Sequence, residues 1–325
     1  MKNIAKMFLV LLLVVFVSAC GNNGEESDID ASGLKMYMIV STADTFRNVL
    51  MDQAQKTADE LGASITFVDS ENVLENQLAQ IDEAVSQGYD VIICNPVDVD
   101  TTLQLQVAAG DIPIVFWNSC PDESRLEAGK YVYVGSNEED AGNFQAEYIL
   151  DKFSDKDEID VVVFMGQKLH SATLGRTNSL KHVLKQSDKK INYVFADFAD
   201  WDQAAAKEQM DLFLKTGQEF DCVACNNDSM ALGVIESMKE HNIDFDKVPV
   251  LGVDATADGC AAIEAGEMSF TVYQSAVGQG EYAVKAAALL AKGESLKKLQ
   301  YASEDEKYVW VPFEKVDKNN YKEYE

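Results

Sequence analysis

Polar and aromatic side chains suited to binding a small polyhydroxylated molecule follow several apolar runs of this sequence. They are carboxylates, planar amides, one imidazole and one indole, and in chain order they are Ser41 to Asp44, Asn95, Asn118, His170, Trp201, Asp202, Asn226 to Asp228 and Asp254. Each hydroxyl of such a ligand needs a donor and an acceptor, and an aromatic ring can cover the apolar face of a sugar. The set therefore indicates a neutral polyhydroxylated ligand.

Enzymatic chemistry is poorly supported by the same residues. The chain has three histidines, and no GxSxG motif surrounds any serine. No glycine-rich phosphate loop follows the first apolar run, so nucleotide binding is not expected. Asp44 and Asp254 could form a glycosidase pair, but the amides and Arg176 suit ground-state binding better than proton transfer. We predict a binding protein that needs no organic cofactor, and not an enzyme.

The charge of the chain narrows the choice of partner. Among 325 residues, 27 Lys and Arg face 55 Asp and Glu, for a formal charge of −28. Such a surface repels phosphate backbones and anionic lipid headgroups, so nucleic acid is excluded as a partner. A neutral small molecule or a cation remains.

The elements that must position these residues form an alternating pattern. Apolar runs of five or six residues occur at 36–40, 64–68, 90–95, 112–117, 131–135, 160–164, 191–195, 221–226 and 248–253. Amphipathic stretches separate them, which predicts βαβ units and parallel sheets whose carboxyl edges bind the ligand. There are too many runs for one ordinary sheet. We therefore predict an α/β protein with two Rossmann-like lobes, divided near Asn118–Arg125, where SCPDES breaks the rhythm.

The amino terminus predicts export. Two lysines, an apolar run from Met7 to Val17 and small residues before Cys20 are typical of a signal peptide over residues 1–19. A cysteine after small residues resembles a bacterial lipobox, so Cys20 is the predicted lipidation site. The alternative is a general signal peptide cut at a nearby alanine. Residues 20–33 are small, polar and acidic, which predicts a flexible tether.

Cysteine usage gives one ambiguous motif. Cys222 and Cys225 form a CxxC, which could be a redox or metal site. They lie in an apparent buried strand, where residues three apart point to opposite faces, and no second CxxC or nearby histidine completes a zinc set. We predict core thiols.

Several stretches resemble one bacterial family. They are PIVFWN, YVGSNEEDAG, DWDQAAAKEQMDLFL, CNNDSMALGVIESMK, VPVLGVDA and VWVPFEKVDKNN, in order between residues 35 and 324. They look like the galactose/glucose-binding proteins, which are type I periplasmic-binding-protein-fold receptors of sugar ABC transporters. The resemblance implies a three-strand hinge, with crossings near Asn118, Tyr273 and Pro312. The N-terminal lobe would hold residues 34–117 and 275–309, and the C-terminal lobe residues 118–274 and 310–325.

The resemblance also implies a site. A sugar would lie between Phe46 and Trp201, one ring from each lobe. Its hydroxyls would be bound by polar side chains carried over by position, with a further amide at the hinge. These residues are Asp44, Asn95, His170, Arg176, Asn227, Asp254 and, at the hinge, Gln274.

Three positions depart from the family pattern. Ala172 stands where the family has an aspartate near the anomeric hydroxyl, and Gln274 stands where it has a hinge asparagine. A lost carboxylate removes a bond of about 1.5–3 kcal/mol, and alanine makes room for a glycoside or an altered sugar. The stretch FSDKDEID lacks the turn glycine and the glutamine of the family's calcium loop, so we predict no structural calcium.

The implied function is that of an extracytoplasmic substrate-binding lipoprotein of a sugar ABC importer. Its ligand would be a glucose- or galactose-like hexose or its glycoside, and its partner a membrane permease. We expect a monomer, held to the cell membrane only by its lipid, on a Gram-positive surface rather than in a periplasm. The alternatives are a sensor that docks on a membrane signalling receptor, and the same transport role with a pentose or other polyol.

Overall fold

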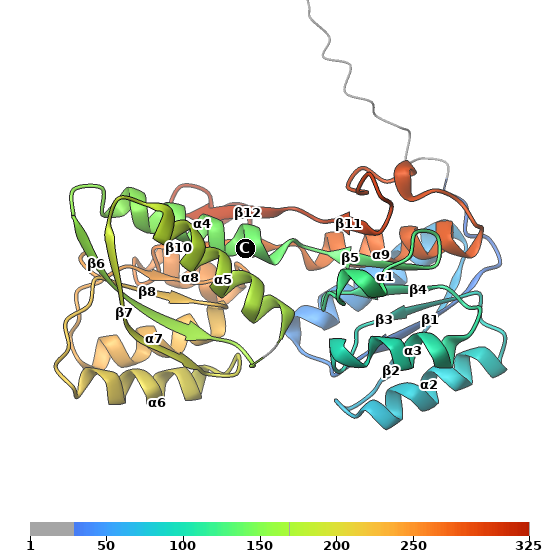
Figure 1. Cartoon of the computed structure of the whole chain (residues 1–325), viewed down its shortest axis with the longest axis horizontal. Helices are drawn as coiled ribbons and strands as arrows, with labels where there is room; N and C mark the ends of the chain where they lie inside the picture. Colours follow the sequence, from blue (N-terminus) through green and yellow to red (C-terminus); the bar gives the residue numbers. More distant parts are fainter. Residues whose placement is uncertain (1–28, 169, 325) are drawn as a thin grey trace, which may run out of the picture.

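The computed structural model describes residues 29–168 and 170–324, which form two α/β lobes side by side (Figure 1). The predicted signal peptide, Cys20 and most of the tether lie outside the described residues. Within the described ranges, none of the helices combines the length and the apolar character needed to cross a bilayer.

The N-terminal lobe is built on a six-stranded parallel sheet in the order β11-β5-β4-β3-β1-β2. Its strands are β1 (Lys35–Val40), β2 (Ser64–Asp69), β3 (Val91–Cys94), β4 (Ile114–Trp117), β5 (Tyr131–Gly135) and β11 (Tyr308–Trp310). Its helices are α1 (Thr45–Leu61), α2 (Leu74–Ser86), α3 (Thr102–Ala109) and α9 (Ala276–Ala291).

The C-terminal lobe is built on a second six-stranded sheet, in the order β12-β10-β9-β8-β6-β7. Its strands are β6 (Glu158–Met165), β7 (Lys190–Phe198), β8 (Cys222–Cys225), β9 (Val250–Leu251), β10 (Phe270–Gln274) and β12 (Phe313–Asp317). Its helices are α4 (Glu138–Lys152), α5 (Ser171–Gln186), α6 (Gln203–Leu214), α7 (Asp228–Glu240) and α8 (Ala257–Glu264). The predicted two lobes are confirmed, but this sheet is not wholly parallel, because β12 runs antiparallel to β10.

Both faces of each sheet are covered, which explains the apolar runs. Along β1, Met36 and Met38 enter one buried cluster while Tyr37 and Ile39 enter another, as the two-residue period of a strand requires. Helix α9 packs closely on α1, since a β-carbon on Gly280 would lie 2.3 Å from the carbonyl oxygen of Leu50. The sheets are therefore sandwiched between helices.

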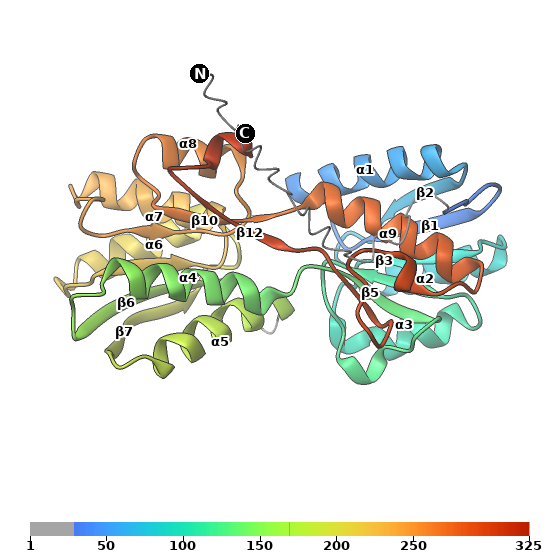
Figure 2. The same ribbon diagram turned by 90° about the horizontal axis from the view of Figure 1, so that it is seen from above.

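The chain crosses between the lobes three times (Figure 2). The first crossing follows Gly135, the second lies between Gln274 and α9, and the third lies between Trp310 and Phe313. The last two are close to the expected Tyr273 and Pro312.

The expected first division at residues 117 and 118 is wrong. Strand β5 pairs in parallel with β4, with Val132 opposite Val115, so the first sheet continues to Gly135. Asn118 has a φ of 60°, and it begins a loop that returns the chain to the same sheet. The break in rhythm after β4 therefore marks a turn within the N-terminal lobe and not the hinge.

The CxxC motif lies on β8, as predicted. Cys222 belongs to one buried cluster and Cys225 to the cluster on the opposite face, and both are free thiols. Burial raises the pKa of each thiol above its usual range. The prediction that these cysteines are core residues is confirmed.

Candidate functional site

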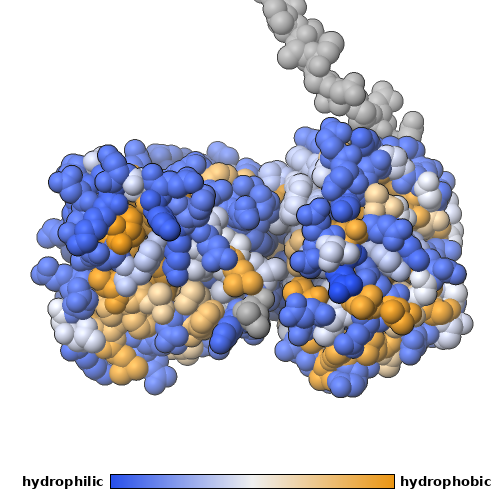
Figure 3. Space-filling view, in the orientation of Figure 1, coloured by the Kyte–Doolittle hydropathy of each residue, from blue (hydrophilic) through white to orange (hydrophobic). Residues whose placement is uncertain are grey.

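A cleft lies between the lobes, which Figure 3 shows as two masses joined by a narrower waist. It holds two spaces that share lining residues: one of about 480 Å³, here called the outer space, and one of about 150 Å³ on the hinge side, here called the inner pocket. Both are lined by Asp44, Arg47, His170 and Trp201. The inner pocket is also lined by Phe46, Asn118, Glu138, Ala172, Arg176, Asn227, Asp254 and Gln274.

The N-lobe wall of the inner pocket comes from the start of α1 and from the loop after β4. Asp44 is the N-cap of α1, and its carboxylate accepts a bond from the backbone N–H of Arg47 at 2.7 Å. The same carboxylate pairs with Nη1 of Arg47 at 2.6 Å. Phe46 packs partly against the N-lobe core and lines the pocket with its remaining surface.

On the other wall, His170 caps helix α5. Its Nδ1 accepts a bond from the backbone N–H of Ala172 at 3.2 Å, which leaves the proton of the neutral ring on Nε2. Burial lowers the pKa of His170 to about 4, and the charges of Arg47 and Arg176 add to this effect. His170 is therefore a neutral donor at physiological pH.

Trp201 stands beside this histidine, with the ring centroids 5.4 Å apart and the planes at 78°. It has a φ of 67°, and the next residue, Asp202, caps α6 by accepting from the N–H of Ala205 at 2.7 Å. A β-carbon on Gly166 would lie 2.1 Å from the Trp201 ring. Glycine at this position makes room for the indole against β6.

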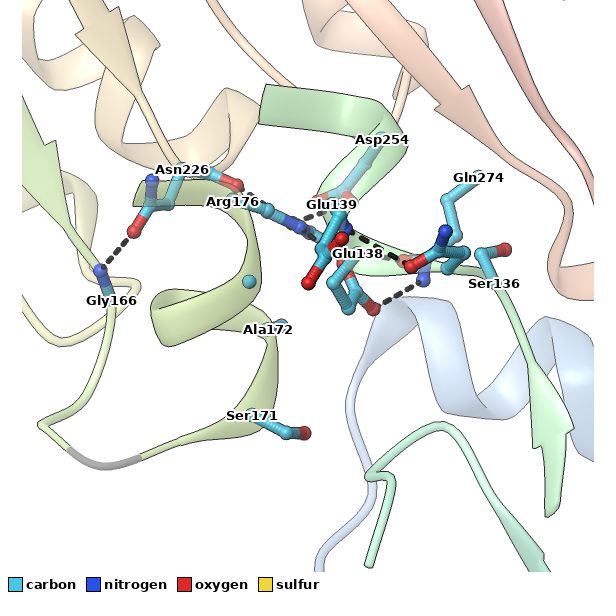
Figure 4. Close-up of polar contacts among 12 residues, drawn as sticks. Ser136, Glu138, Glu139, Gly166, Ser171, Ala172, Arg176, Asn226, Asp254 and Gln274 are labelled. Carbon is cyan, nitrogen blue, oxygen red and sulfur yellow. Dashed lines mark hydrogen bonds and ion pairs between the residues drawn. The ribbon is translucent and has the colours of Figure 1, made fainter. Parts of the chain in front are cut away.

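Arg176 lies at the base of the pocket, with only 4% of its side chain exposed (Figure 4). Its Nε donates to Glu138 at 2.6 Å, and its Nη1 donates to the carbonyl oxygen of Asn226 at 2.7 Å. Its Nη2 donates to Gln274 at 3.4 Å, and Asp254 lies 3.7 Å from Nη1. Through these hydrogen bonds, the guanidinium on α5 links the start of α4, the end of β8 and β10.

Two carboxylates beside this arginine have perturbed ionisation. Burial raises the pKa of Glu138, against the opposing effect of Arg176. Burial also raises the pKa of Asp254 well above its usual range, again opposed by Arg176. Asp254 has a φ of 117°, a left-handed backbone conformation that is unfavourable for a residue with a side chain. Strain of this kind is often found at functional sites.

The neighbouring Asn227 and Asp228 divide into a pocket residue and a structural one. Asn227 lines the pocket and caps α7 by accepting from the N–H of Met230 at 3.0 Å. Asp228 is fully buried behind it and accepts from Thr271 Oγ1 at 2.6 Å and from the N–H of Thr256 at 2.8 Å. Burial raises the pKa of Asp228 to about 6.

The structure gathers most of the sequence-predicted site around the inner pocket. The residues brought together are Asp44, Phe46, His170, Arg176, Trp201, Asn227, Asp254 and Gln274. Asn95 does not line it: this side chain is 0% exposed. It accepts from Ser41 Oγ at 2.5 Å and donates to Ser119 Oγ at 3.1 Å. Its amide ties the ends of neighbouring strands together.

Sequence reasoning missed two charged residues of the pocket. Arg47 follows Phe46 directly, in the first turn of α1, so helical spacing could have placed it beside Asp44. Glu138 lies in the stretch YVGSNEEDAG, which the expected division at residue 118 placed within the C-terminal lobe and away from the hinge. Its place at the hinge became visible only from the position of β5.

Comparison with known proteins agrees with this geometry. Residues 36–295 match the family described as periplasmic binding protein domain, and the chain belongs to that family. It is 36% identical over 282 residues to a putative rhizopine-binding protein of Rhizobium meliloti, covering 86% of this chain and 87% of the relative. It is 28% identical over 332 residues to the D-galactose/methyl-galactoside binding periplasmic protein of Haemophilus influenzae, covering 97% and 98%.

A solved structure shares the two-lobed fold. It is an ABC transporter solute-binding protein from Bacillus halodurans with bound myo-inositol, at a TM-score of 0.78 and 29% identity. The match covers 91% of this chain and 98% of the other.

Membership of the periplasmic binding protein family, the two-lobed α/β fold and the role of a binding protein rather than an enzyme are thus as predicted. The chain is a sugar-binding, extracytoplasmic component of an ABC transporter. A galactose or glucose ligand remains a prediction.

Proposed function

We propose that this protein delivers a single hexose-sized ring, a glucose- or galactose-like hexose or its glycoside, to the permease of an ABC importer. The inner pocket of about 150 Å³ between Phe46 and Trp201 supports this ligand size. Pockets for drug-sized ligands are larger, at roughly 300–1,000 Å³. The lining of carboxylates, amides and a neutral imidazole offers partners for several hydroxyls.

The proposed mechanism is closure of the lobes on the ligand. Because the pocket is lined from both lobes, a bound ring gains its full set of contacts only when the walls approach. A ligand shifts such an equilibrium only by this difference in contacts. For a ligand of about twelve heavy atoms, roughly 0.6–0.8 kcal/mol per atom gives an affinity near micromolar. The closed form is what the permease, or a membrane sensor, would recognise.

A cyclic polyol such as myo-inositol is the second candidate ligand. Ala172, 5% exposed, lines the pocket and brings no carboxylate to it from α5. A cyclitol has no anomeric centre and carries a hydroxyl at every ring carbon, so it does not need an acid at that place. The likeness to the protein with bound myo-inositol favours the same ligand class.

We further propose that a lipid on Cys20 anchors a monomer at the outer face of the membrane, on a Gram-positive surface. The fold needs no structural calcium in this proposal. In the turn between α4 and β6, Lys156 pairs with Asp221, which puts an ammonium group where the family's calcium loop would stand. Equal melting temperatures with calcium and with EDTA are expected.

A thermal-shift panel on the chain without its leader tests the ligand. It contains glucose, galactose, methyl-galactosides, ribose, xylose and myo-inositol. A binder at a hundred times its dissociation constant adds about 2.7 kcal/mol of stability, a shift of a few degrees for this size. Stabilisation by glucose or galactose supports the hexose, and stabilisation by myo-inositol alone supports the second candidate. No response to any of them would overturn the proposed function.

A further inference from the structure

Glu138 is a buried carboxylate that the pocket shares with the hinge. It is the first residue of α4, directly after the first crossing between the lobes, and 8% of its side chain is exposed. It lines the inner pocket together with Ala172 and Gln274. A buried carboxylate facing a ligand pocket is costly unless it is paired, so its partners show what it does.

The partners of Glu138 are both predicted ligand contacts. Its Oε2 accepts from Nε of Arg176 at 2.6 Å, and its Oε1 accepts from Nε2 of Gln274 at the longer distance of 3.4 Å. Figure 4 shows the group at the junction of α4 and α5. An ionised carboxylate has about four acceptor positions, and these two donors from the described residues occupy two. Acceptor capacity therefore remains on the carboxylate of a residue that lines the pocket.

Helix α5 is shaped to admit this side chain. A β-carbon on Gly175 would lie 2.6 Å from the β-carbon of Glu138, and one on Gly142 would lie 2.1 Å from the carbonyl oxygen of Arg176. The two glycines therefore let α4 and α5 approach closely, with Glu138 against Gly175 and bonded to the adjacent Arg176. The carboxylate absent at position 172 has a counterpart on the facing helix.

We propose that Glu138 determines which ring the pocket accepts, by taking a hydrogen bond from a ring hydroxyl beside Gln274 in place of an acid on α5. This inference rests on the proposed function, because it requires a polyhydroxylated ligand. The residues at positions 138, 172 and 274 then belong together. Compared with the family pattern, the acid lies on α4 as Glu138 and not on α5 at position 172. Gln274 on β10 is one methylene longer than asparagine and reaches this acid. The hydroxyl is then recognised by a hydrogen bond from the hinge side of the pocket.

Calorimetric titration of the mature chain with two probes, D-galactose and myo-inositol, tests this inference. Glu138→Gln keeps the shape of the side chain but removes its charge, and it should weaken the tighter probe about tenfold or more. Glu139→Gln is the matched control, since it removes the same charge from an exposed position in the same turn. It should change both affinities less than twofold.

Two further variants separate ligand contact from mere support of Arg176. Adding Ala172→Asp to Glu138→Gln should restore affinity and change the ratio of the two affinities in favour of galactose. Glu138→Asp, which keeps the charge on a shorter arm, should lose less than Glu138→Gln. If Glu138 only positions Arg176, both probes weaken by the same factor in Glu138→Gln and Ala172→Asp brings no recovery. Thermal unfolding of every variant checks that the fold is intact.

The outcomes distinguish this inference from the proposed function. If the wild type binds neither probe nor any sugar of the panel, both are overturned. If the wild type binds and Glu138→Gln behaves like Glu139→Gln, only the role of Glu138 is overturned.

Discussion

The two walls of the cleft differ in how much of their polar chemistry is fixed within the protein. On the C-lobe wall, Arg176 is 4% exposed and joins Glu138, Gln274 and the backbone of β8. On the N-lobe wall, the Asp44 side chain is 47% exposed and pairs mainly with Arg47 from its own helix. One wall is a preorganised network and the other is a helix start facing solvent.

This difference bears on two free energies, that of ligand binding and that of unfolding. Groups that are already held in place lose little freedom when a ligand binds, which favours affinity. A buried network is also part of the fold, so changing it costs stability as well. Changes in the C-lobe network should therefore affect unfolding and binding together, and a change at the exposed Asp44 of the N-lobe wall should affect binding alone.

The largest expected effect is that of Arg176→Met. Removing the guanidinium leaves the buried Glu138 and the partly exposed Asp254 without their cation, which should cost about 3–5 kcal/mol and abolish sugar binding. Burial raises the pKa of both carboxyl groups, so folding favours their protonated forms. Stability from such groups is present at low pH and lost as pH rises. Urea unfolding should show a larger loss at pH 8 than at pH 5, and an equal loss would contradict the network.

Trp201→Ala should come next. The indole provides the aromatic surface of the C-lobe wall, and its removal should lower the affinity for the sugar at least tenfold. Phe46→Ala on the opposite wall is the matched change and should reduce binding in the same direction. Calorimetry measures both, and unchanged binding in Trp201→Ala would eliminate the stacking role.

Asp44→Asn should have a smaller effect, confined to binding. Asparagine is as good an N-cap as aspartate, and the exposed pair with Arg47 contributes at most about 1 kcal/mol, so unfolding should hardly change. The ligand hydroxyl would then bond to a neutral amide instead of a carboxylate, which should weaken affinity by about threefold to tenfold. A substantial fall in melting temperature would show that the N-lobe wall is also part of a stabilising network.

The smallest effect should be that of pH on His170. Because its pKa is lowered to about 4, the ring stays neutral from pH 5.5 to 8, and affinity should vary less than twofold over that range. Its contribution to stability is present above about pH 6.5 and is lost as pH falls towards 4. His170→Asn keeps a capping side chain and should lose less stability between these values. Calorimetry and urea unfolding at several pH values measure both effects.

Much of the fold follows from local pattern. Strands such as β1 and β8 are short, β-rich and buried on both faces, and Asp44 and Asp202, which cap α1 and α6, are good N-cap residues. The hinge was harder to predict, because β5 has the same apolar pattern as any other strand. Only its pairing with β4 shows to which sheet it belongs.

The site was predicted best where strand ends and helix starts coincide. His170, Asn227 and Asp254 all follow strands of the second lobe and face the pocket. Asn95 also follows a strand, but its amide turns inwards to Ser41 and Ser119, and position along the chain cannot reveal that direction. Glu138 was missed because its place depends on the sheet to which β5 belongs and on the close packing of α4 against α5, neither of which the local sequence shows.

The edge strands of the two sheets affect when each lobe can fold during synthesis. Strand β11 closes one edge of the N-lobe sheet and β12 one edge of the C-lobe sheet, and each follows every other strand of its sheet in the sequence. Helix α9, which packs in the N-lobe core, also follows β1 to β5 of that lobe, with most of the C-lobe in between. Neither lobe can finish folding before the ribosome has synthesised these segments. Distant pairings of this kind also slow folding. Lobes that close only once these late segments have been made keep the chain unfolded for longer, which suits passage through a membrane channel.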